Sequence, residues 1–320
     1  MQATAIAQPN IALIKYWGKR DVDRNLPAVG SISITLNELH TEVSVDLDVD
    51  QSADVLLVNG DENPAMLPRI SACLDRVLGS SRPRARIESR SNFPIAAGLA
   101  SSASAFAATT IAAAGAANLA LGTEELARLA GASSGSAARS LYGGFAELKN
   151  LRDSIALTSL GDEGSWPLQV VVAITATGPK ATGSTEAMET SRESSPFYDT
   201  WISQQEQDLA VARTAIARQD FAELATIAEH NCLKMHSVMW ASRPPTVFWN
   251  AATMQCLQTL RRLQGEGCQV FFTIDAGPQV KAVCLPDDAD AVRQALAETP
   301  GVQEIMTTGL GPAARLVEEK

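Results

Sequence analysis

The spacing of hydrophobic positions separates the chain into strands and helices. A period of two, or a short apolar run, predicts strands at 11–14, 43–49, 55–58, 85–87, 168–175, 269–275, 280–285 and 302–307. A period of three to four predicts helices at 67–78, 103–119, 197–217, 221–239, 247–263 and 288–297. Gly79 ends the first helix, and we expect Thr123 to cap another helix whose first turn carries Glu124 and Glu125.

The strands fall into separate groups and do not alternate regularly with helices. This grouping predicts an α+β fold and not a doubly wound parallel sheet. A length of 320 residues suits two closely joined domains. The loop 161–164 and the break at Trp166-Pro167 place the boundary between residues 1–166 and residues 167–320.

Composition and net charge limit the kinds of molecule that the protein is expected to bind. Hydrophobic residues make up 46% of the chain and charged residues 19%, enough for a packed core. The net charge of −10 argues against binding to nucleic acid or to an anionic membrane. An anionic ligand would therefore need a local cluster of cations and backbone donors.

The stretch between Arg90 and Glu124 has no charged residue but consists mainly of small residues, which predicts a helix packed on all sides and not a membrane span. The five cysteines form no close CxxC pair and have no histidine at ligand spacing. We therefore expect no zinc site. The odd number of cysteines and the lack of a signal peptide favour reduced thiols and a cytoplasmic location.

The segment Pro94–Ser104 is the strongest local signal of chemistry. Its small residues would let backbone N–H groups approach a phosphate, and Ser101, Ser102 and Ser104 add hydroxyl donors at the start of a helix. It is not a Walker A sequence, because it lacks the Gly-Lys-Ser/Thr ending. Taken alone, a helix start that needs small residues for tight packing explains it equally well.

Three cations and two aromatic residues follow the first apolar strand, within Asn10–Arg20. Lys15 and Lys19 could hold a phosphate or carboxylate, and Tyr16 could donate from its hydroxyl. The alternative is a basic surface patch at a strand end. A second anion-binding candidate is Ser133–Ser140, where Ser134 and Ser136 flank a glycine and Arg139 supplies a planar fork.

Two further segments carry candidate residues. Ser184 and Met188 lie in 182–188, which by itself is typical of an ordinary helix start. Asp275 ends an apolar strand and is followed by a tight Gly-Pro turn, a place where aspartate usually serves as a turn former. We interpret His40, His230, His236 and Cys268 as structural, because they lie outside these motifs.

The five segments together resemble the diphosphomevalonate decarboxylase family of the GHMP kinase superfamily. The matching strings are Asn-Ile-Ala-x-x-Lys-Tyr-Trp-Gly-Lys-Arg at 10–20, Pro-x-x-x-Gly-Leu-Ala-Ser-Ser-Ala at 94–103, Ser-Gly-Ser-Ala-x-Arg-Ser-Leu-Tyr-Gly-Gly at 134–144 and Asp-Ala-Gly-Pro at 275–278. The resemblance implies an N-terminal domain like ribosomal S5 domain 2, a ferredoxin-like C-terminal domain and a deep cleft between them. It also implies a homodimer.

The resemblance further implies an ATP-dependent decarboxylation of a phosphorylated mevalonate. Asp275, Arg139 and Lys15 would be catalytic, and substrate would also contact Tyr16, Lys19, Ser134, Ser136, Ser184 and Met188. ATP would bind Pro94, Ala97, Gly98, Leu99, Ala100, Ser101, Ser102 and Ser104, with Mg²⁺ held through the ATP phosphates and Ser102.

Some positions depart from the family pattern. Ile95 replaces a common threonine, Ala187 replaces a glycine, Gln279 stands where asparagine is typical, and Val29-Gly30 replaces a Ser- or Asn-rich spot. These differences leave three alternatives open: a decarboxylase of mevalonate 5-phosphate, a small-molecule kinase that does not decarboxylate, and a sensor with an inactive site.

Overall fold

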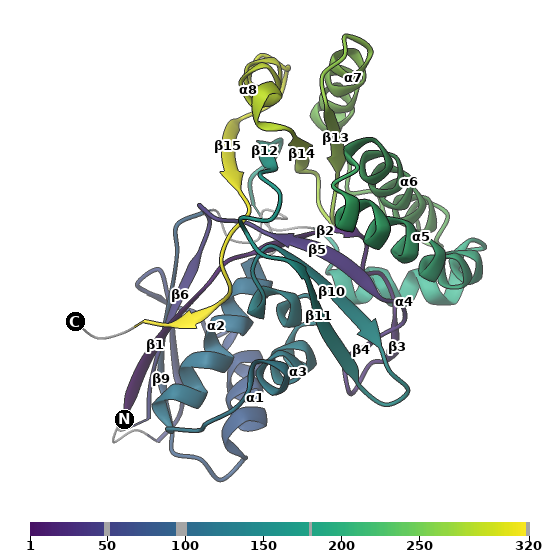
Figure 1. The fold of residues 1–320 in the computed structure, drawn as a ribbon. Helices are drawn as coiled ribbons and strands as arrows, with labels where there is room; N and C mark the ends of the chain where they lie inside the picture. The colour runs from purple at the N-terminus through teal and green to yellow at the C-terminus, as the bar shows by residue number, and fades with distance from the viewer. Residues whose placement is uncertain (48–51, 94–100, 179–180, 318–320) are drawn as a thin grey trace.

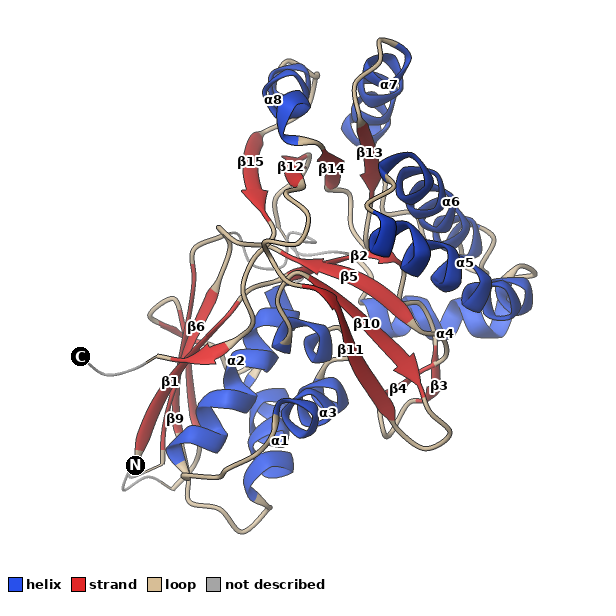
Figure 2. Ribbon diagram, viewed as in Figure 1, coloured by secondary structure: helices blue, strands red, loops and turns tan. Residues whose placement is uncertain are grey.

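The computed structural model describes residues 1–47, 52–93, 101–178 and 181–317, and in it two groups of strands are linked through a shared helical layer (Figure 1). The N-terminal strands lie with helices α1, α2 and α3, and helices α5 to α8 surround the C-terminal strands (Figure 2). Most strand pairs are antiparallel, which is why the chain is α+β, as predicted, and not doubly wound.

The first sheet has six strands in the order β16-β1-β6-β9-β7-β8. Only β7 and β9 pair in parallel, because α1 (Leu67–Leu78) crosses over between them. The strands are β1 (Gln2–Ala7), β6 (Thr41–Asp46), β7 (Val55–Val58), β8 (Asp61–Glu62), β9 (Arg86–Ser91) and β16 (Arg315–Leu316). The last strand of the chain thus returns to the first.

Two antiparallel four-stranded sheets complete the scaffold. One has the order β11-β10-β5-β2, with β2 (Asn10–Ile14), β5 (Ser31–Thr35), β10 (Phe145–Asn150) and β11 (Ile155–Gly161). The other has the order β13-β14-β12-β15, with β12 (Gln169–Ile174), β13 (Val270–Thr273), β14 (Val280–Cys284) and β15 (Glu304–Gly309). A small hairpin pairs β3 (Lys19–Asp21) with β4 (Leu26–Pro27).

The remaining elements are helical. They are α2 (Ser101–Ala116), α3 (Thr123–Ser133), α4 (Ser184–Ser194), α5 (Tyr198–Arg218), α6 (Phe221–Trp240), α7 (Ala251–Gly265) and α8 (Ala289–Ala297), with short 3₁₀ turns η1 (Ala137–Leu141) and η2 (Pro286–Asp288). Of the sixteen residues of α2, twelve are buried, as expected for a small-residue helix packed on several sides. Within the described residues, no helix is both long and apolar enough to cross a membrane.

The core continues from one half of the chain into the other. Alternate residues of β12 point to opposite faces, so Val170 and Val172 join a cluster with β2, β5, α5 and α6, whereas Val171 and Ala173 pack on α7 and α8. Because both faces of this sheet are covered, β12 is a continuous apolar run. The ends of β2 and β13 are thereby held on either side of one core.

The sequence predictions and the structure differ in a few places. Thr123 does not cap its helix: Gly122 is the N-cap, without a side-chain bond, although Glu124 and Glu125 do occupy the first turn. The helix expected from residue 247 begins at Ala251, where Asn250 and Thr253 form a capping box. Strands β1, β5, β10 and β11 were not predicted, because serine, threonine and charged residues interrupt their apolar pattern.

Candidate active site

Both halves of the chain line a cavity of about 540 Å³. Its walls come from the segment after β2, helix α1, the start of α2, the loop before η1, the start of α4 and the turn after β13. Two acids, Asp23 and Asp275, line it together with five cations, which are Lys15, Lys19, Arg69, Arg76 and Arg139. A protein with a net charge of −10 therefore contains a positively charged cleft suited to an anionic ligand.

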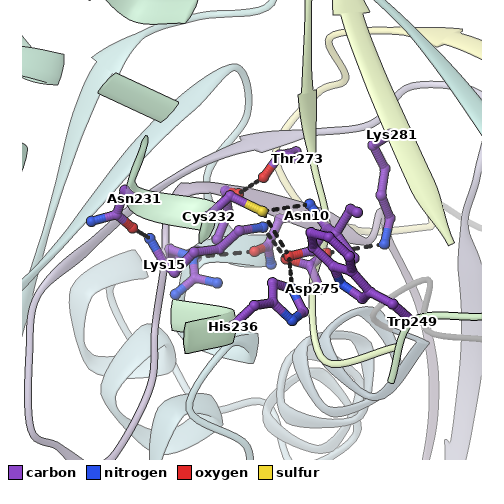
Figure 3. A network of polar contacts seen from close by, with 12 residues as sticks. Asn10, Lys15, Asn231, Cys232, His236, Trp249, Thr273, Asp275 and Lys281 are labelled. Carbon is purple, nitrogen blue, oxygen red and sulfur yellow. Dashed lines mark hydrogen bonds and ion pairs between the residues drawn. The ribbon is translucent and has the colours of Figure 1, made fainter. Parts of the chain in front are cut away.

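Asp275 lies between two buried lysines. The Nζ atom of Lys15 is 2.7 Å from Oδ1 of Asp275, and the Nζ atom of Lys281 is 3.3 Å from Oδ2. The lysine side chains are 1% and 0% exposed, but the Asp275 side chain is 24% exposed and lines the cavity. Figure 3 shows the two lysines approaching this carboxylate from two sides.

The backbone around these groups is fixed by polar contacts from α5 and α6. The backbone N–H of Lys15 donates to Oδ1 of Asn231 at 2.7 Å, and Gln205 donates from Nε2 to the Lys15 carbonyl at 2.8 Å. The Thr273 hydroxyl donates to the carbonyl of Ala12 at 3.1 Å, which ties the end of β13 to β2. The scaffold therefore brings Lys15 and Asp275, which are 260 positions apart in the sequence, into contact.

The residue before Asp275 is held from the side of α6. The backbone N–H of Ile274 donates to Sγ of Cys232 at 3.2 Å, and Nε2 of His236 lies 3.2 Å from the Ile274 carbonyl oxygen (Figure 3). Burial lowers the pKa of His236 to about 3, so its ring is neutral at physiological pH. His236 therefore supports the backbone of this turn without adding charge to it.

Charges around Asp275 determine its protonation state. Burial alone would raise the pKa of the Asp275 carboxyl, but the charges of Lys15 and Lys281 and their hydrogen bonds outweigh it and hold the pKa well below its usual range. This carboxylate is therefore ionised near neutral pH, where it accepts a hydrogen bond more readily than it takes up a proton.

Arg139 is nearly fully buried at one wall of the cavity. Its Nε donates to Oδ1 of Asn10 at 3.1 Å and its Nη1 donates to the Ser31 hydroxyl at 2.7 Å. Asn10 in turn donates to Ser140 at 2.8 Å, so the fork has a fixed orientation. Burial lowers the pKa of Arg139 to about 10, which still leaves it charged near neutral pH.

Tyr16 and the two serines of the glycine loop lie together. Ser134, Ser136 and Tyr16 all line the cavity, and a Cβ on Gly135 would lie 2.4 Å from the Tyr16 hydroxyl, so only glycine fits there. Burial raises the pKa of Tyr16 to about 12, and its buried hydroxyl has no hydrogen-bond partner among the described residues. This donor is positioned for a ligand atom.

The start of helix α4 contributes a further part of the cavity wall. Ser184 and Met188 line the cavity near the helix start, where Gly183 is the N-cap. The Nζ atom of Lys19 donates to the Thr185 hydroxyl at 3.1 Å, which orients this cation across the cleft. Burial lowers the pKa of Lys19, against the opposing effect of Glu189.

The predicted phosphate loop is only partly described. Ser102 lines the cavity at the start of α2 next to Ser101. Ser104 is fully buried and its hydroxyl is 2.8 Å from the Thr41 hydroxyl, so it contacts the first sheet and not the cavity. The other predicted loop residues, which are Pro94, Ala97, Gly98, Leu99 and Ala100, lie outside the described residues.

Several residues of this site were not singled out by sequence. Arg69 and Arg76 reach the cavity from α1, where the helical pattern indicated only a buried apolar face. Asn10 and Asn231 are ordinary polar residues until the fold brings them to Arg139 and Lys15. Lys281 did carry a signal, because a lysine within the apolar run 280–284 is a buried charge that needs a partner.

Family models and relatives identify the family of the chain. Residues 7–158 match the model of the diphosphomevalonate decarboxylase-like N-terminal domain, and residues 170–311 match that of the mevalonate 5-diphosphate decarboxylase C-terminal domain. The human diphosphomevalonate decarboxylase is 33% identical, with 89% of this chain and 77% of the relative aligned. The chain belongs to the diphosphomevalonate decarboxylase family.

Other members of the family show the same similarity in sequence and structure. A phosphomevalonate decarboxylase of Haloferax volcanii is 31% identical over 100% of this chain and 98% of its own. The solved structure "MDDEF in complex with MVAPP, AMPPCP and Magnesium" has a TM-score of 0.93 at 33% identity, covering 100% of this chain and 99% of that one. The mevalonate diphosphate decarboxylase from Staphylococcus aureus has a TM-score of 0.92 at 33% identity, covering 99% and 98%. The predicted GHMP kinase-type fold is thereby confirmed.

Proposed function

We propose that this chain catalyses the ATP-dependent decarboxylation of mevalonate 5-diphosphate, giving isopentenyl diphosphate, ADP, phosphate and carbon dioxide. The observation that carries the proposal is the ionised Asp275, held by Lys15 at 2.7 Å, in a cationic cavity that Arg139 also lines. One cleft thus contains a carboxylate that can accept a hydrogen bond from a hydroxyl and a guanidinium fork that can bind a carboxylate. The relatives named as diphosphomevalonate decarboxylases support the choice of reaction.

The reaction needs two bond changes at the tertiary carbon of the substrate. Asp275 accepts a hydrogen bond from the 3-hydroxyl, whose oxygen forms a bond to the γ-phosphorus of ATP as the bond to ADP breaks, and the hydroxyl proton passes to an oxygen of the transferred phosphoryl group. The 3-phosphate then leaves with its electron pair. The bond to the carboxylate supplies the electrons of the new double bond, and carbon dioxide departs.

Each catalytic candidate has a part in this sequence. Lys15 neutralises charge on the transferring phosphoryl group and keeps Asp275 ionised. Arg139 holds the substrate carboxylate through its fixed fork, so that the breaking bond stays aligned with the leaving phosphate. The hydrogen bonds from Arg139 to Asn10 and Ser31 support this role, because they fix the plane of the guanidinium.

The diphosphate end of the substrate requires further cations and donors. We assign it to Tyr16, Lys19, Ser134 and Ser136, with contacts from Ser184 and Met188. Arg69 and Arg76 add two charges from α1 to the same cavity. Two observations support a site for a polyanion. The Tyr16 hydroxyl has no hydrogen-bond partner among the described residues, and five cations line the cavity.

The nucleotide is assigned to the loop before α2. Ser101 and Ser102 stand at the N-terminus of α2, where backbone N–H groups and the helix dipole favour phosphate. In the described part of the chain no cluster of three His, Cys, Asp or Glu could hold a metal, so the residues fit a Mg²⁺ held mainly by ATP phosphates and Ser102. When bound, Mg²⁺ would neutralise charge on the transferring phosphate.

A decarboxylase of mevalonate 5-phosphate is the second candidate. The relative from Haloferax volcanii, named a phosphomevalonate decarboxylase, covers the whole of this chain at an identity close to that of the diphosphate enzymes. The two candidates differ in the charge at the far end of the substrate. Lys19, Arg69 and Arg76 favour the more highly charged diphosphate.

One assay separates these functions. ADP, phosphate and carbon dioxide release would be measured with mevalonate 5-diphosphate and with mevalonate 5-phosphate as alternative substrates. We expect all three products in equal amounts and a higher kcat/KM for the diphosphate. ADP without carbon dioxide would identify a kinase, binding without ADP would identify a sensor, and preference for the monophosphate would select the second candidate.

Cellular context and assembly complete the proposal. We place the enzyme in the cytoplasm, in isoprenoid and sterol or lipid biosynthesis, as a homodimer, and we divide the chain into domains 1–166 and 167–320. The family models support this division, because they match on either side of residues 159–169. Sedimentation measured across a range of protein concentrations tests the homodimer.

A further inference from the structure

Lys281 is a fully buried lysine in the middle of the C-terminal sheet. It lies on β14 opposite Thr273 of β13 and Val172 of β12, and its side chain is 0% exposed. By strand alternation it shares a face with Val283, which packs in the apolar cluster of β2, α5 and α6. An ammonium group in such a place requires a counter-charge.

The counter-charge that the described structure provides is Asp275. Nζ of Lys281 lies 3.3 Å from Oδ2, while Nζ of Lys15 binds Oδ1 at 2.7 Å. Burial lowers the pKa of the Lys281 ammonium, whereas the neighbouring Asp275 raises it. The surroundings of position 281 in the sheet are apolar, but the residue there is a lysine whose charge lies beside the candidate catalytic carboxylate of Asp275.

The two lysines differ in their access to ligand. Lys15 lines the cavity, so it can contact a bound phosphate as well as Asp275. Lys281 does not belong to the cavity lining and approaches Asp275 from the side of the sheet (Figure 3). Any influence of Lys281 on the reaction must therefore act through the carboxylate.

We propose that Lys281 is a positioning residue, which holds Oδ2 of Asp275 at the sheet so that the carboxylate stays ionised and directs its remaining lone pairs at the reacting hydroxyl. The proposal rests on the function proposed above. A carboxylate has about four acceptor positions, and two lysines at two different oxygens restrain its rotation better than one. Lys15 is then able to move toward a transferring phosphate while Asp275 remains in place.

Other ionisable groups near Asp275 do not provide this restraint. Those that act on it from the neighbouring elements, besides the two lysines, are Arg139 of η1 and Cys232 and His236 of α6. Burial raises the pKa of the Cys232 thiol and lowers that of His236 to about 3, so both are neutral at pH 7. Arg139 is charged but donates to Asn10 and Ser31.

The first test measures the carboxyl directly, without substrate. Protein labelled with ¹³C at aspartate carboxyls would be titrated by NMR, and the Asp275 signal would be identified by its loss in Asp275→Asn. In the wild type we expect no titration across the folded range. In Lys281→Met we expect the pKa of Asp275 to move up into that range, whereas the surface control Lys149→Met should leave it unchanged.

Lys281→Met should fold, because methionine fills a similar volume on an apolar sheet face and removes a buried charge. If it does not fold, Lys281→Gln gives the same readout with a neutral hydrogen-bond donor. If the Asp275 signal of the folded variant shows the same lack of titration as that of the wild type, the proposal is overturned, whatever the substrate of the enzyme is.

The second test separates positioning from general damage. We expect kcat of Lys281→Met to fall roughly 10- to 100-fold and the acid limb of its pH profile to move to higher pH. KM for ATP should stay close to that of the wild type, since Lys281 does not line the cavity. Equal losses at every pH would show a merely structural role. The pKa of Asp275 could rise in Lys281→Met although the wild-type enzyme does not decarboxylate mevalonate diphosphate. That result would refute the proposed function and leave the positioning role intact.

Discussion

Asp54 and Asp275 are two carboxylates paired with buried cations, but they are satisfied to different degrees. Asp54 receives four hydrogen bonds: two from Arg82 at 2.9 and 2.6 Å, one from Ser71 at 2.6 Å and one from the Ala85 backbone at 2.9 Å. Its side chain is 5% exposed. Asp275 has two lysines as described partners, and 24% of its side chain faces the cavity.

The difference separates a structural ion pair from a functional one. Both carboxyls have a depressed pKa, so that property alone does not identify a catalytic residue. All four acceptor positions of Asp54 are in use, which leaves nothing for a ligand. The Asp275 side chain stays partly exposed and lines the cleft, and this access is what a reaction can use.

The largest expected effect is that of Asp275→Asn. Loss of the anionic acceptor should lower turnover per folded molecule roughly 10²- to 10⁴-fold. Because the change also leaves the buried Lys15 and Lys281 without their counter-charge, the free energy of unfolding should fall as well. Release of ADP and carbon dioxide measures the loss, and circular dichroism checks the fold. Turnover within a fewfold of the wild type would remove Asp275 from the mechanism.

Asp54→Asn should show the reverse pattern. Removing one partner of a buried ion pair leaves Arg82 with an uncompensated charge, so we expect the free energy of unfolding to fall by about 3 kcal/mol. Asp75, which lies 2.8 Å from Nε of Arg82, would retain part of the pairing. Urea unfolding measures this change, and activity per folded molecule should match the wild type. A large loss of kcat would contradict the structural assignment.

Arg139→Lys tests the fixed fork at the cleft. The planar guanidinium of Arg139 donates to Asn10 and Ser31 and still has an edge to present to a carboxylate. A lysine ammonium cannot do both. We expect kcat/KM to fall about 100-fold. Arg213→Lys is the matched control, since the ion pair of Arg213 with Glu147 lies outside the cavity. Equal activity of the two variants would refute the role of Arg139.

The smallest expected effect is the pH dependence of stability at Asp54. Burial would raise the pKa of its carboxyl, but hydrogen bonds from Arg82, Ser71 and Ala85 lower it to about 2, below the ordinary 3.8. The stabilisation is therefore complete above about pH 4 and is lost as the pH falls toward 2, a change of roughly 2 kcal/mol. Urea midpoints of the wild type and Asp54→Asn should converge over this range. A constant difference would disprove the linkage.

The sequence predicted most elements whose pattern is set by local spacing. Strand 55–58 and helix 67–78 have the bounds that the apolar positions indicate, and the helices that form α5 and α6 agree to within a residue or two. Strands β5 and β10 escaped prediction because burial of Ser31, Ser33 and Glu147 depends on partners far away in the sequence. Local periodicity does not contain that information.

The sequence also does not show which distant segments come together to form the cleft. Lys15, Arg139 and Asp275 stand in recognisable motifs, and the structure brings them to one cavity. Their roles remain predictions for the assays above. Lys281 carries one sequence signal, a lysine within an apolar run, whereas Arg69 and Asn231 gain importance only from contacts made by the fold. Such residues have no local motif, because their surroundings consist of segments distant in sequence.

The pairing of β16 with β1 has a consequence for the edge of the first sheet. Leu316 pairs with Ala5 and packs against Gly115 of α2, and the backbone N–H of Val317 donates to the Thr4 carbonyl at 2.8 Å. Because β16 covers the edge of β1, deletion of 315–317 should expose an unpaired strand edge prone to association.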